Sequence, residues 1–290
     1  MEATNILDRA LREYKPLTII ISYSGGYDSM VAGHLTARWA RRFAHSANVK
    51  TASVDTLLSA DGYPDFVRQS ARAAGMPPVE VWTPTDKMIE EWHERIVAKG
   101  LAWCRSQHHI NYYYLKQSVF RRMVAHYSRH RYDRVLFVNG VRRAESPQRR
   151  NAPEHGRNGN YAYCNPLVHW SDKDIEDYRY QNDLPKNPFY DIGNSRDCLC
   201  NWHTQFDLDT VRRYAKKALI HIERAHRAST ESWGYGYGEV PRNGTFHADS
   251  GVQMDLPGFD EIPNLCSGCA KPSASNEARD YRALQNWGAE

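Results

Sequence analysis

The residues best suited to chemistry lie together in one short segment, Ser22-Tyr23-Ser24-Gly25-Gly26-Tyr27-Asp28-Ser29. Two adjacent glycines let the backbone approach an anion without interference from a Cβ atom. Free amides at the start of the helix expected after them favour negative charge, as does the helix dipole. We therefore predict a phosphate-binding loop in which Ser22, Ser24 and Ser29 add hydroxyl groups. A glycine turn with an ordinary helix cap is the alternative interpretation.

The carboxylate of Asp28 is unusual in a phosphate-binding loop. It would repel a bare phosphate, so its presence is better explained by helix capping or by Mg²⁺ shared with the phosphates. The loop lacks the Gly-Lys-[Ser/Thr] ending of a Walker A loop and the Gly-x-Gly-x-x-Gly order of a dinucleotide-binding turn. Its order of residues therefore indicates a different kind of nucleotide site.

Four of the six cysteines form two close pairs, Cys198-Leu199-Cys200 and Cys266-Ser267-Gly268-Cys269. In a cytosolic chain, such spacing indicates metal ligands more than disulfides. Four soft thiolates select an iron–sulfur cluster or zinc, and four unligated thiols are the remaining alternative. Cys104, beside Arg105, is a candidate nucleophile, although a packing role fits it equally well.

The arginines are clustered, although the net charge is only +4. The clusters are Arg38, Arg41 and Arg42; Arg121, Arg122, Arg129, Arg131 and Arg134; and Arg142, Arg143, Arg149, Arg150 and Arg157. Such clusters fit a nucleic acid or are solvated helix faces. Arg142 and Arg143 follow a predicted strand, where they would give charge-assisted bonds to phosphate or sulfate. A surface pair balanced by Glu145 is the alternative.

Strand-like and helix-like segments alternate in the first half of the chain, which predicts a parallel sheet flanked by helices. The expected strands are 18–21, 49–54, 79–82 and 134–138, and the expected helices follow Ser29 and cover 65–74, 86–99, 117–127, 172–181 and 210–229. Because ligands sit at the carboxyl ends of parallel strands, Asp55, Thr56 and Gly140 should converge on the loop. Residues 144–160 are expected to form a mobile basic loop.

Length and composition set the class of protein. Hydrophobic residues make up 41% and charged residues 25% of the 290 positions, as in ordinary globular proteins. No apolar run approaches the roughly 20 residues that span a bilayer, and the N-terminus does not resemble a secretory signal. We expect a cytoplasmic protein without a membrane partner, with a nucleotide-binding domain over 1–195 and an irregular four-cysteine region over 196–290. A homo-oligomer is also expected.

Several segments, in order along the chain, resemble one superfamily. The loop resembles the PP-loop of ATP pyrophosphatases and adenylyl-sulfate reductases. Residues 139–146, 165–175 and 184–191 resemble motifs of the phosphoadenylyl-sulfate (PAPS) reductase family, as do Asp55-Thr56 and residues 103–106. The resemblance implies an adenine nucleotide α-hydrolase-like fold that binds ATP, adenylyl sulfate (APS) or PAPS with Mg²⁺. The residues that would hold the nucleotide are Ser22, Ser24, Gly25, Gly26, Asp28, Ser29, Asp55, Thr56 and Gly140.

The same resemblance bears on the cysteines. Adenylyl-sulfate reductases and the related iron–sulfur protein of DNA phosphorothioation carry a [4Fe-4S] cluster. This implies that Cys198, Cys200, Cys266 and Cys269 hold such a cluster here, with Zn²⁺ as the alternative. The chain departs from the reductases after Cys269, where it has no further cysteine, whereas those enzymes use a C-terminal cysteine as nucleophile.

Three functions remain open from the sequence. The intact Asp28-Ser29 ending is the form found in ATP-cleaving members of the superfamily, and it favours an ATP pyrophosphatase or adenylyltransferase that activates an acceptor for sulfur transfer. The catalytic candidates are then Asp28, Arg142, Arg143 and Cys104, and a sulfur donor or partner protein is expected. The alternatives are a sulfonucleotide reductase that releases sulfite and a non-catalytic subunit that binds nucleotide or nucleic acid.

Overall fold

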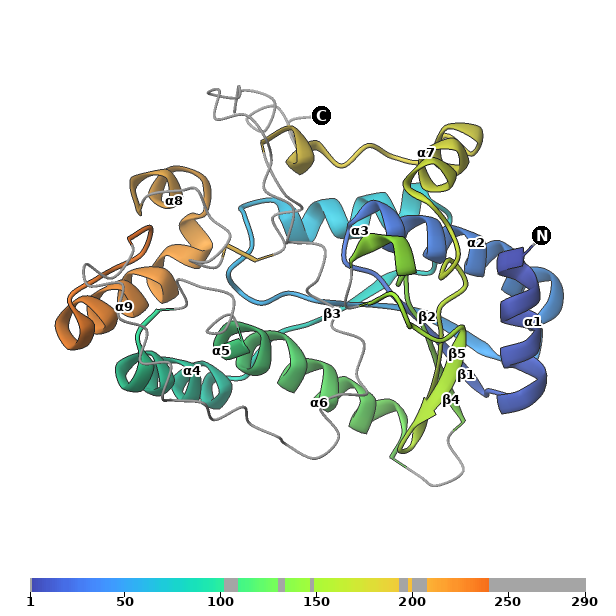
Figure 1. Ribbon diagram of the computed structural model, residues 1–290, viewed down its shortest axis with the longest axis horizontal. Helices are drawn as coiled ribbons and strands as arrows, with labels where there is room; N and C mark the ends of the chain where they lie inside the picture. Colours follow the sequence, from blue (N-terminus) through green and yellow to red (C-terminus); the bar gives the residue numbers. More distant parts are fainter. Residues whose placement is uncertain are drawn as a thin grey trace.

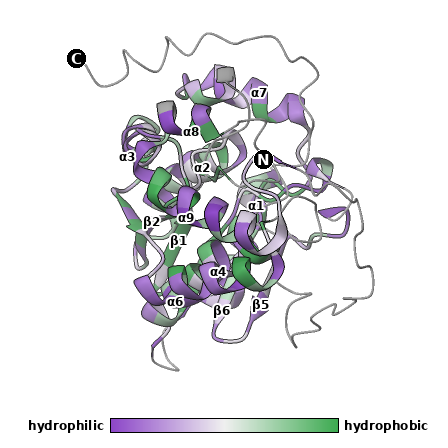
Figure 2. Cartoon of the chain, turned by 90° about the vertical axis from the view of Figure 1, so that its left-hand side faces the viewer, coloured by the Kyte–Doolittle hydropathy of each residue, from purple (hydrophilic) through white to green (hydrophobic). Residues whose placement is uncertain are grey.

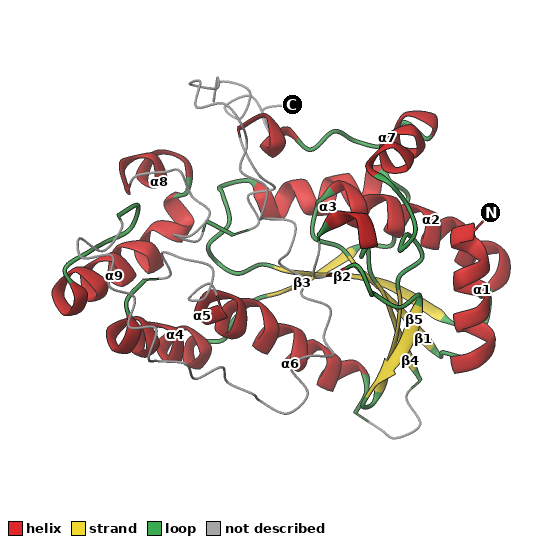
Figure 3. Cartoon of the chain, in the orientation of Figure 1, coloured by secondary structure: helices red, strands yellow, loops and turns green. Residues whose placement is uncertain are grey.

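A mostly parallel sheet of six strands forms the centre of the protein (Figures 1 and 3). The computed structural model describes residues 2–101, 109–129, 134–146, 149–192, 198–199 and 208–239. In the order β3-β2-β1-β4-β6-β5, the first five strands run parallel and β5 runs antiparallel to β6. The strands are β1 (Thr18–Ser22), β2 (Asn48–Val54), β3 (Val79–Trp82), β4 (Val135–Val138), β5 (His155–Asn158) and β6 (Tyr161–Cys164).

Helices cover both faces of this sheet. In Figure 1, α2 and α3 lie on one side of it and α6 on the other. Figure 2 shows helices that carry both hydrophilic and hydrophobic residues, as expected for elements with one buried face. The helices are α1 (Glu2–Tyr14), α2 (Tyr27–Phe43), α3 (Tyr63–Ala73), α4 (Asp86–Lys99), α5 (His109–Asn111), the π-helix η1 (Tyr112–Gln117), α6 (Ser118–Tyr127), the 3₁₀ turns η2 (Arg143–Glu145) and η4 (Pro188–Ile192), α7 (Asp172–Gln181), α8 (Leu208–Tyr214) and α9 (Lys216–Trp233).

The winding of the chain reverses between β1 and β4. β1 pairs with β2 on one side and with β4 on the other, although the chain visits β2 and β3 before it reaches β4. In open α/β sheets, such a reversal places a crevice at the carboxyl ends of the two strands. The glycine loop follows β1 at this point, and Asn139 and Gly140 follow β4.

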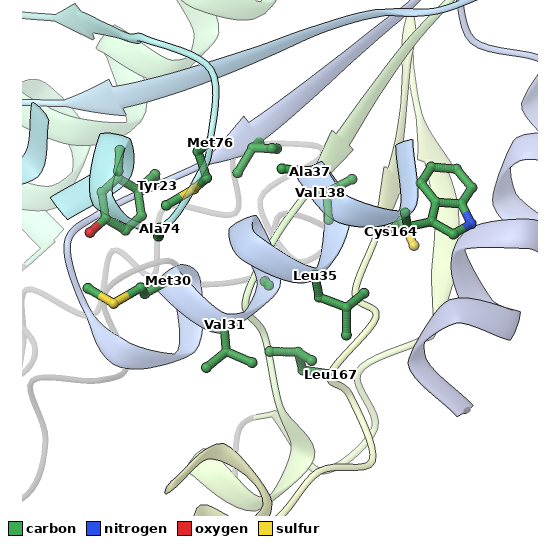
Figure 4. Close-up of a cluster of buried hydrophobic side chains, with 14 of the residues drawn as sticks. Tyr23, Met30, Val31, Leu35, Ala37, Ala74, Met76, Val138, Cys164 and Leu167 are labelled. Carbon is green, nitrogen blue, oxygen red and sulfur yellow. The ribbon is translucent and has the colours of Figure 1, made fainter. Parts of the chain in front are cut away.

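Side chains of β1 alternate between two apolar layers. Ile19 and Ile21 pack with α1, α2 and α3, while Ile20 packs on the other face with Phe120 of α6 and Phe137 of β4. All three isoleucines are fully buried, as the period of two along a strand requires when both faces are covered. Figure 4 shows part of the larger layer, where α2 packs against residues that include Val138, Cys164 and Leu167.

A further apolar cluster lies beside the sheet, between α4 and α9. Trp92 and Ile96 of α4 pack with Ala218, Ile222 and Ala225 of α9. Tyr235 and Tyr237, which follow α9, are also buried in this cluster. The described part of the C-terminal region is therefore held against α4 by apolar contacts.

The structure confirms the predicted fold, a parallel sheet flanked by helices. The helix over 86–99 and the helix over 172–181 match α4 and α7, and Ser171 caps α7 in a capping box with Asp174. The helix predicted over 210–229 was wrong in detail because the chain breaks at Ala215, between α8 and α9. Cys164, at the end of β6, is fully buried, and burial raises the pKa of its thiol.

The prediction of a mobile basic loop over 144–160 was wrong for the described part of this segment. It contains η2 and the strand β5, which forms an antiparallel hairpin with β6. The polar and glycine-rich sequence of β5, His-Gly-Arg-Asn, lacks the apolar alternation by which a strand is recognised. Backbone pairing with β6 supplies the order that its side chains do not predict.

Among the described helices, none combines the length and the apolar character that crossing a membrane requires.

Candidate nucleotide site

The loop between β1 and α2 is a tight turn in which no side chain caps the start of α2. Gly25 has φ +82°, a left-handed conformation that glycine adopts without steric cost. Gly26 precedes the first residue of α2 and provides no side-chain cap. The Ser29 hydroxyl lies 3.2 Å from the Ser24 hydroxyl and donates to the Gly26 carbonyl at 2.8 Å. Because the first amides of a helix have no partner within it, they are free to bind an anion.

Two side chains from other parts of the chain donate hydrogen bonds to backbone carbonyls of this loop. The Tyr63 hydroxyl donates to the Ser24 carbonyl at 2.5 Å, and the Asn187 amide donates to the Gly25 carbonyl at 3.0 Å. Tyr63 is 4% exposed and Asn187 is fully buried. The sequence placed Asn187 within a family-like motif but predicted a structural turn there, and nothing local to Tyr63 indicated its role.

Asp28, in the first turn of α2, forms an ion pair with Arg142. The distance is 3.1 Å, and the same guanidinium reaches Asp172 at the start of α7 at 2.8 Å. The Arg142 side chain is 5% exposed, that of Asp28 25% and that of Asp172 69%. Burial raises the pKa of Asp28 even though the Arg142 charge opposes that rise. Burial lowers the pKa of Arg142, but the two carboxylates raise it further, so the guanidinium stays charged.

Two buried polar atoms on residues that the sequence predicted for the site lack a partner. Among the described residues, the Ser22 hydroxyl and the Arg142 Nε have no hydrogen-bond partner. Buried polar groups are almost always satisfied, and an unsatisfied one costs about 1–3 kcal/mol. An anion bound at the carboxyl end of β1 would offer oxygen acceptors to both atoms.

A second buried ion pair adjoins the first. Glu145 and Arg149 pair across η2, with side chains 15% and 8% exposed. Burial raises the pKa of Glu145, and the nearby Asp28 carboxylate raises it as well. The sequence identified Arg149 as a member of a basic cluster but not as a buried residue of the site. Arg142 and Arg149 therefore give this edge of the sheet two positive charges close to Asp28.

Gly140 fits against the loop because it has no side chain. A Cβ atom there would lie 2.6 Å from the Asp28 carbonyl carbon and 2.7 Å from the Ser29 amide nitrogen. The segment after β4 and the first turn of α2 are thus in backbone contact, as the strand reversal predicts. This contact brings Arg142 within reach of Asp28.

Asp55 and Thr56 lie at the carboxyl end of β2, the strand next to β1. The Asp55 carboxylate accepts bonds from the Leu57 amide at 3.0 Å and the Ser59 hydroxyl at 3.1 Å. Leu57 has φ +62°, a conformation that is rare for a side chain of this kind. The Leu58 carbonyl accepts a 2.6 Å bond from the Leu199 amide. That bond places Cys198, the neighbouring residue, beside the loop that follows β2.

Other arginines predicted to bind an anion contact the protein itself. Arg143 is largely exposed and donates to the Ala152 carbonyl at 2.9 Å, away from the Asp28 pair. Arg38 donates to Asn182, and Arg41 donates to the Gly75 carbonyl. Arg122 donates to the Thr83 carbonyl and lies over the Trp82 ring. The structure thus brings Arg142 and Arg149 to the site and directs Arg143 elsewhere.

Several predicted site residues lie outside the residues that the structure describes. They are Cys104, Cys200, Cys266 and Cys269. Cys198 is partly buried and packs against the α4–α9 cluster. Within the described ranges, no group of three or more His, Cys, Asp or Glu side chains is arranged to hold a metal. The four-cysteine site therefore stays a prediction.

The fold and the loop together define an α/β protein with a glycine turn at the switch point of its sheet. The chain belongs to the phosphoadenosine phosphosulfate reductase domain family, whose model matches residues 18–199. That match begins at β1 and ends beside Cys198, so it contains every described element of the site.

Two curated relatives match over a short segment. Adenosine 5'-phosphosulfate reductase of Salinibacter ruber is 36% identical over 63 residues, which are 21% of this chain and 25% of that protein. The enzyme of the same name from Geobacillus thermodenitrificans is 34% identical over 61 residues, 20% of this chain and 26% of that protein. The matched segment thus spans about a quarter of the length of these relatives.

Two solved structures are similar at low sequence identity. Phosphoadenylyl-sulfate reductase from Candida auris, in a phosphate complex, has a TM-score of 0.47 and 19% identity over 67% of this chain and 86% of that one. NAD+ synthetase from Burkholderia pseudomallei has a TM-score of 0.42 and 16% identity over 63% of this chain and 74% of that one.

Proposed function

We propose that the protein binds ATP with Mg²⁺ at the loop 22–29 and transfers AMP to an acceptor, which is thereby activated for sulfur transfer. The observation that carries the proposal is the arrangement at the end of β1. The start of α2 has no side-chain cap, the buried Arg142 pairs there with the partly buried Asp28, and the Ser22 hydroxyl and the Arg142 Nε have no hydrogen-bond partner among the described residues. The ligand that satisfies these groups combines several anionic oxygens with a cation, as a magnesium nucleotide does.

In this reaction, a nucleophilic oxygen of the acceptor attacks the α-phosphorus of ATP. The bond between the α-phosphorus and the bridging oxygen breaks, and pyrophosphate leaves with the electron pair. The cations of Arg142 and Arg149 lie where they would stabilise the charge that develops on pyrophosphate. A sulfur nucleophile can then displace AMP from the adenylated acceptor, and the sulfur donor is either a small molecule or a partner protein.

The residues present fit Mg²⁺ held through one carboxylate. Mg²⁺ is commonly bound by one or two protein carboxylates together with substrate phosphates and water. Asp28 supplies such a carboxylate at the start of α2, and its partner Arg142 has a second carboxylate, Asp172, to pair with. Bound Mg²⁺ would neutralise phosphate charge and orient the phosphate chain.

A thiol-bound metal would extend this site. Cys198 lies beside the loop that carries Asp55 and Thr56, because the Leu199 amide binds the Leu58 carbonyl. A [4Fe-4S] cluster or Zn²⁺ held by Cys198, Cys200, Cys266 and Cys269 would therefore be anchored near the carboxyl end of β2. Anaerobic purification with an absorption spectrum and metal analysis distinguishes iron from zinc.

The second candidate is a sulfonucleotide reductase. The relatives from Salinibacter ruber and Geobacillus thermodenitrificans favour it, since both are adenosine 5'-phosphosulfate reductases. Such an activity would use APS or PAPS in place of ATP and release sulfite. Arg142 and Arg149 would then face the sulfate or phosphate of the substrate, and Cys104 would be a candidate nucleophile.

One experiment separates the two candidates. The full-length, metal-replete protein is incubated with Mg²⁺·ATP, and the products are resolved into AMP with pyrophosphate or ADP with phosphate. A parallel sample receives APS or PAPS with a dithiol, and sulfite is measured. We expect tight ATP binding and slow release of AMP and pyrophosphate even with water as acceptor. Sulfite release without any ATP binding would instead establish the reductase.

A further inference from the structure

Two carbonyl groups of the phosphate-binding loop are held by side chains from distant parts of the chain. Tyr63, on α3, binds the Ser24 carbonyl, and Asn187, before η4, binds the Gly25 carbonyl. Asn187 is 162 positions away from Gly25 along the sequence. Both bonds come from buried side chains.

These bonds fix the direction of two amide groups. Because a peptide unit is planar and trans, the carbonyl of one residue and the N–H of the next point in opposite directions. The bond from Tyr63 to the Ser24 carbonyl therefore directs the Gly25 N–H away from Tyr63. In the same way, the bond from Asn187 to the Gly25 carbonyl directs the Gly26 N–H away from Asn187. In the described part of the chain, neither of these two amides donates to the backbone.

The two donors are themselves rigidly placed. The Tyr63 ring packs edge-on against Phe189 with centroids 5.0 Å apart and also contacts Phe66. The side-chain Oδ1 of Asn187 accepts a hydrogen bond from the Phe189 amide at 2.9 Å, which sets the orientation of the Asn187 side-chain amide. Gly25 fits closely beneath them, since a Cβ atom there would lie 2.7 Å from the Tyr63 hydroxyl. The packed side chains of Tyr63, Asn187 and Phe189 thus set the orientation of two successive peptide groups.

We infer that Tyr63 and Asn187 are positioning residues that turn the Gly25 and Gly26 amides toward the phosphate chain of the nucleotide. The inference rests on the proposed function, because it takes the loop 22–29 as the site of the phosphates. Without these bonds, the two peptides can rotate and present carbonyl oxygens, which repel an anion. The residues act through the backbone and make no contact with the ligand of their own.

The test compares ligands that share or lack the phosphate chain. Tyr63→Phe removes one hydroxyl and keeps the ring packing, and Asn187→Ala removes the second donor. The matched control is Tyr235→Phe, because the buried Tyr235 hydroxyl also donates to a backbone carbonyl, that of Leu101 at 2.8 Å, in the α4–α9 cluster. Calorimetric affinities are measured for Mg²⁺·ATP, Mg²⁺·pyrophosphate and adenosine, together with melting temperatures of the ligand-free proteins.

We expect Tyr63→Phe to weaken ATP and pyrophosphate alike by about ten-fold, the equivalent of one hydrogen bond. Adenosine binding and the melting temperature should change no more than they do in Tyr235→Phe. Wild-type affinity of Tyr63→Phe for both phosphate ligands would overturn the inference and leave the proposed function standing. A melting temperature far below that of Tyr235→Phe, with adenosine binding weakened equally, would also overturn it. A wild-type protein that binds neither phosphate ligand would overturn both proposals.

Discussion

The carboxyl-terminal edge of the sheet, which carries the loop 22–29 and Arg142, differs from the α4–α9 cluster in the contacts that hold it together. At the edge, buried charges are paired with partners from different elements, as Arg142 is with Asp28 and Asp172. In the α4–α9 cluster, apolar side chains dominate, and the buried His93 ring has no hydrogen-bond partner among the described residues. The edge therefore depends on a few directional contacts, whereas the cluster depends on buried area. Substitutions at the edge should change binding, and substitutions in the cluster should change stability.

The largest effect is expected at Gly140. A methyl group there would collide with backbone atoms of Asp28 and Ser29, which cannot move without displacing the start of α2. We expect Gly140→Ala to weaken ATP binding by roughly 1,000-fold, about 4 kcal/mol. Gly33→Ala is the matched control, because its new Cβ meets the end of the flexible Met76 side chain. Equal affinities of the two variants in calorimetry would show that the backbone contact is unimportant.

The second largest effect is expected at the two carboxylates, Asp28 and Asp172, that pair with Arg142. We expect Asp28→Asn to slow pyrophosphate release from ATP by about 100-fold, about 2.7 kcal/mol, because it removes both the proposed Mg²⁺ ligand and the buried partner of Arg142. Asp172→Asn alters the other, largely exposed partner and should change the rate only a few-fold. Initial rates with saturating Mg²⁺·ATP make the comparison. Equal losses in both variants would contradict the role of Asp28 as the functional partner.

The α4–α9 cluster should show the reverse pattern. Ile222 is 2% exposed, and its truncation in Ile222→Ala should lower the free energy of unfolding by about 2–4 kcal/mol. Nucleotide affinity of the folded fraction should stay within about two-fold of wild type, since the contacts of the loop 22–29 are intact. Denaturant unfolding and calorimetry measure the two quantities. A large loss of nucleotide affinity at unchanged stability would contradict this prediction and show that the cluster contributes to nucleotide binding.

The smallest effect concerns His93. Burial, together with the Arg224 charge and against the opposing charge of Glu90, lowers the pKa of His93 to about 4. His221 of α9 lies 6.5 Å away, ring to ring, and its pKa is also lowered by burial. Between pH 4 and about 6.5, the unfolded chain binds a proton at this position that the folded chain does not. The contribution to stability is therefore complete above pH 6.5 and is lost as the pH falls toward 4.

We expect wild-type protein to lose about 2–3 kcal/mol of stability through this residue over that range. His93→Phe, which cannot titrate, should show a shallower dependence of melting temperature on pH. His93 lies in the helical cluster, so nucleotide affinity should be the same in both proteins at pH 7. Identical slopes for the two proteins between pH 4 and 6.5 would contradict the prediction.

Much of the fold could be predicted because its signals are local. The apolar strand before the loop, the helix over 86–99 and the Ser171 cap all depend on residues a few positions apart. The strand β5 could not be predicted in this way, since its polar residues are ordered by pairing with β6. The break at Ala215 likewise depends on neighbours from elsewhere in the chain, because the amides of Lys216 and Lys217 bind Asp61.

The candidate site, like the fold, has features that local sequence predicts and features that depend on contacts between distant segments. The sequence by itself determined the glycine turn, the position of Asp28 at the start of a helix and the nearness of Gly140 and Arg142 to a strand end. Only the tertiary structure decided that Arg142 faces Asp28 while Arg143 turns toward Ala152, and that Tyr63 and Asn187 hold the turn. The physical reason is that backbone conformation follows from short-range sterics and periodicity. The partner of a buried polar group, in contrast, is set by which distant segments the packed sheet brings together.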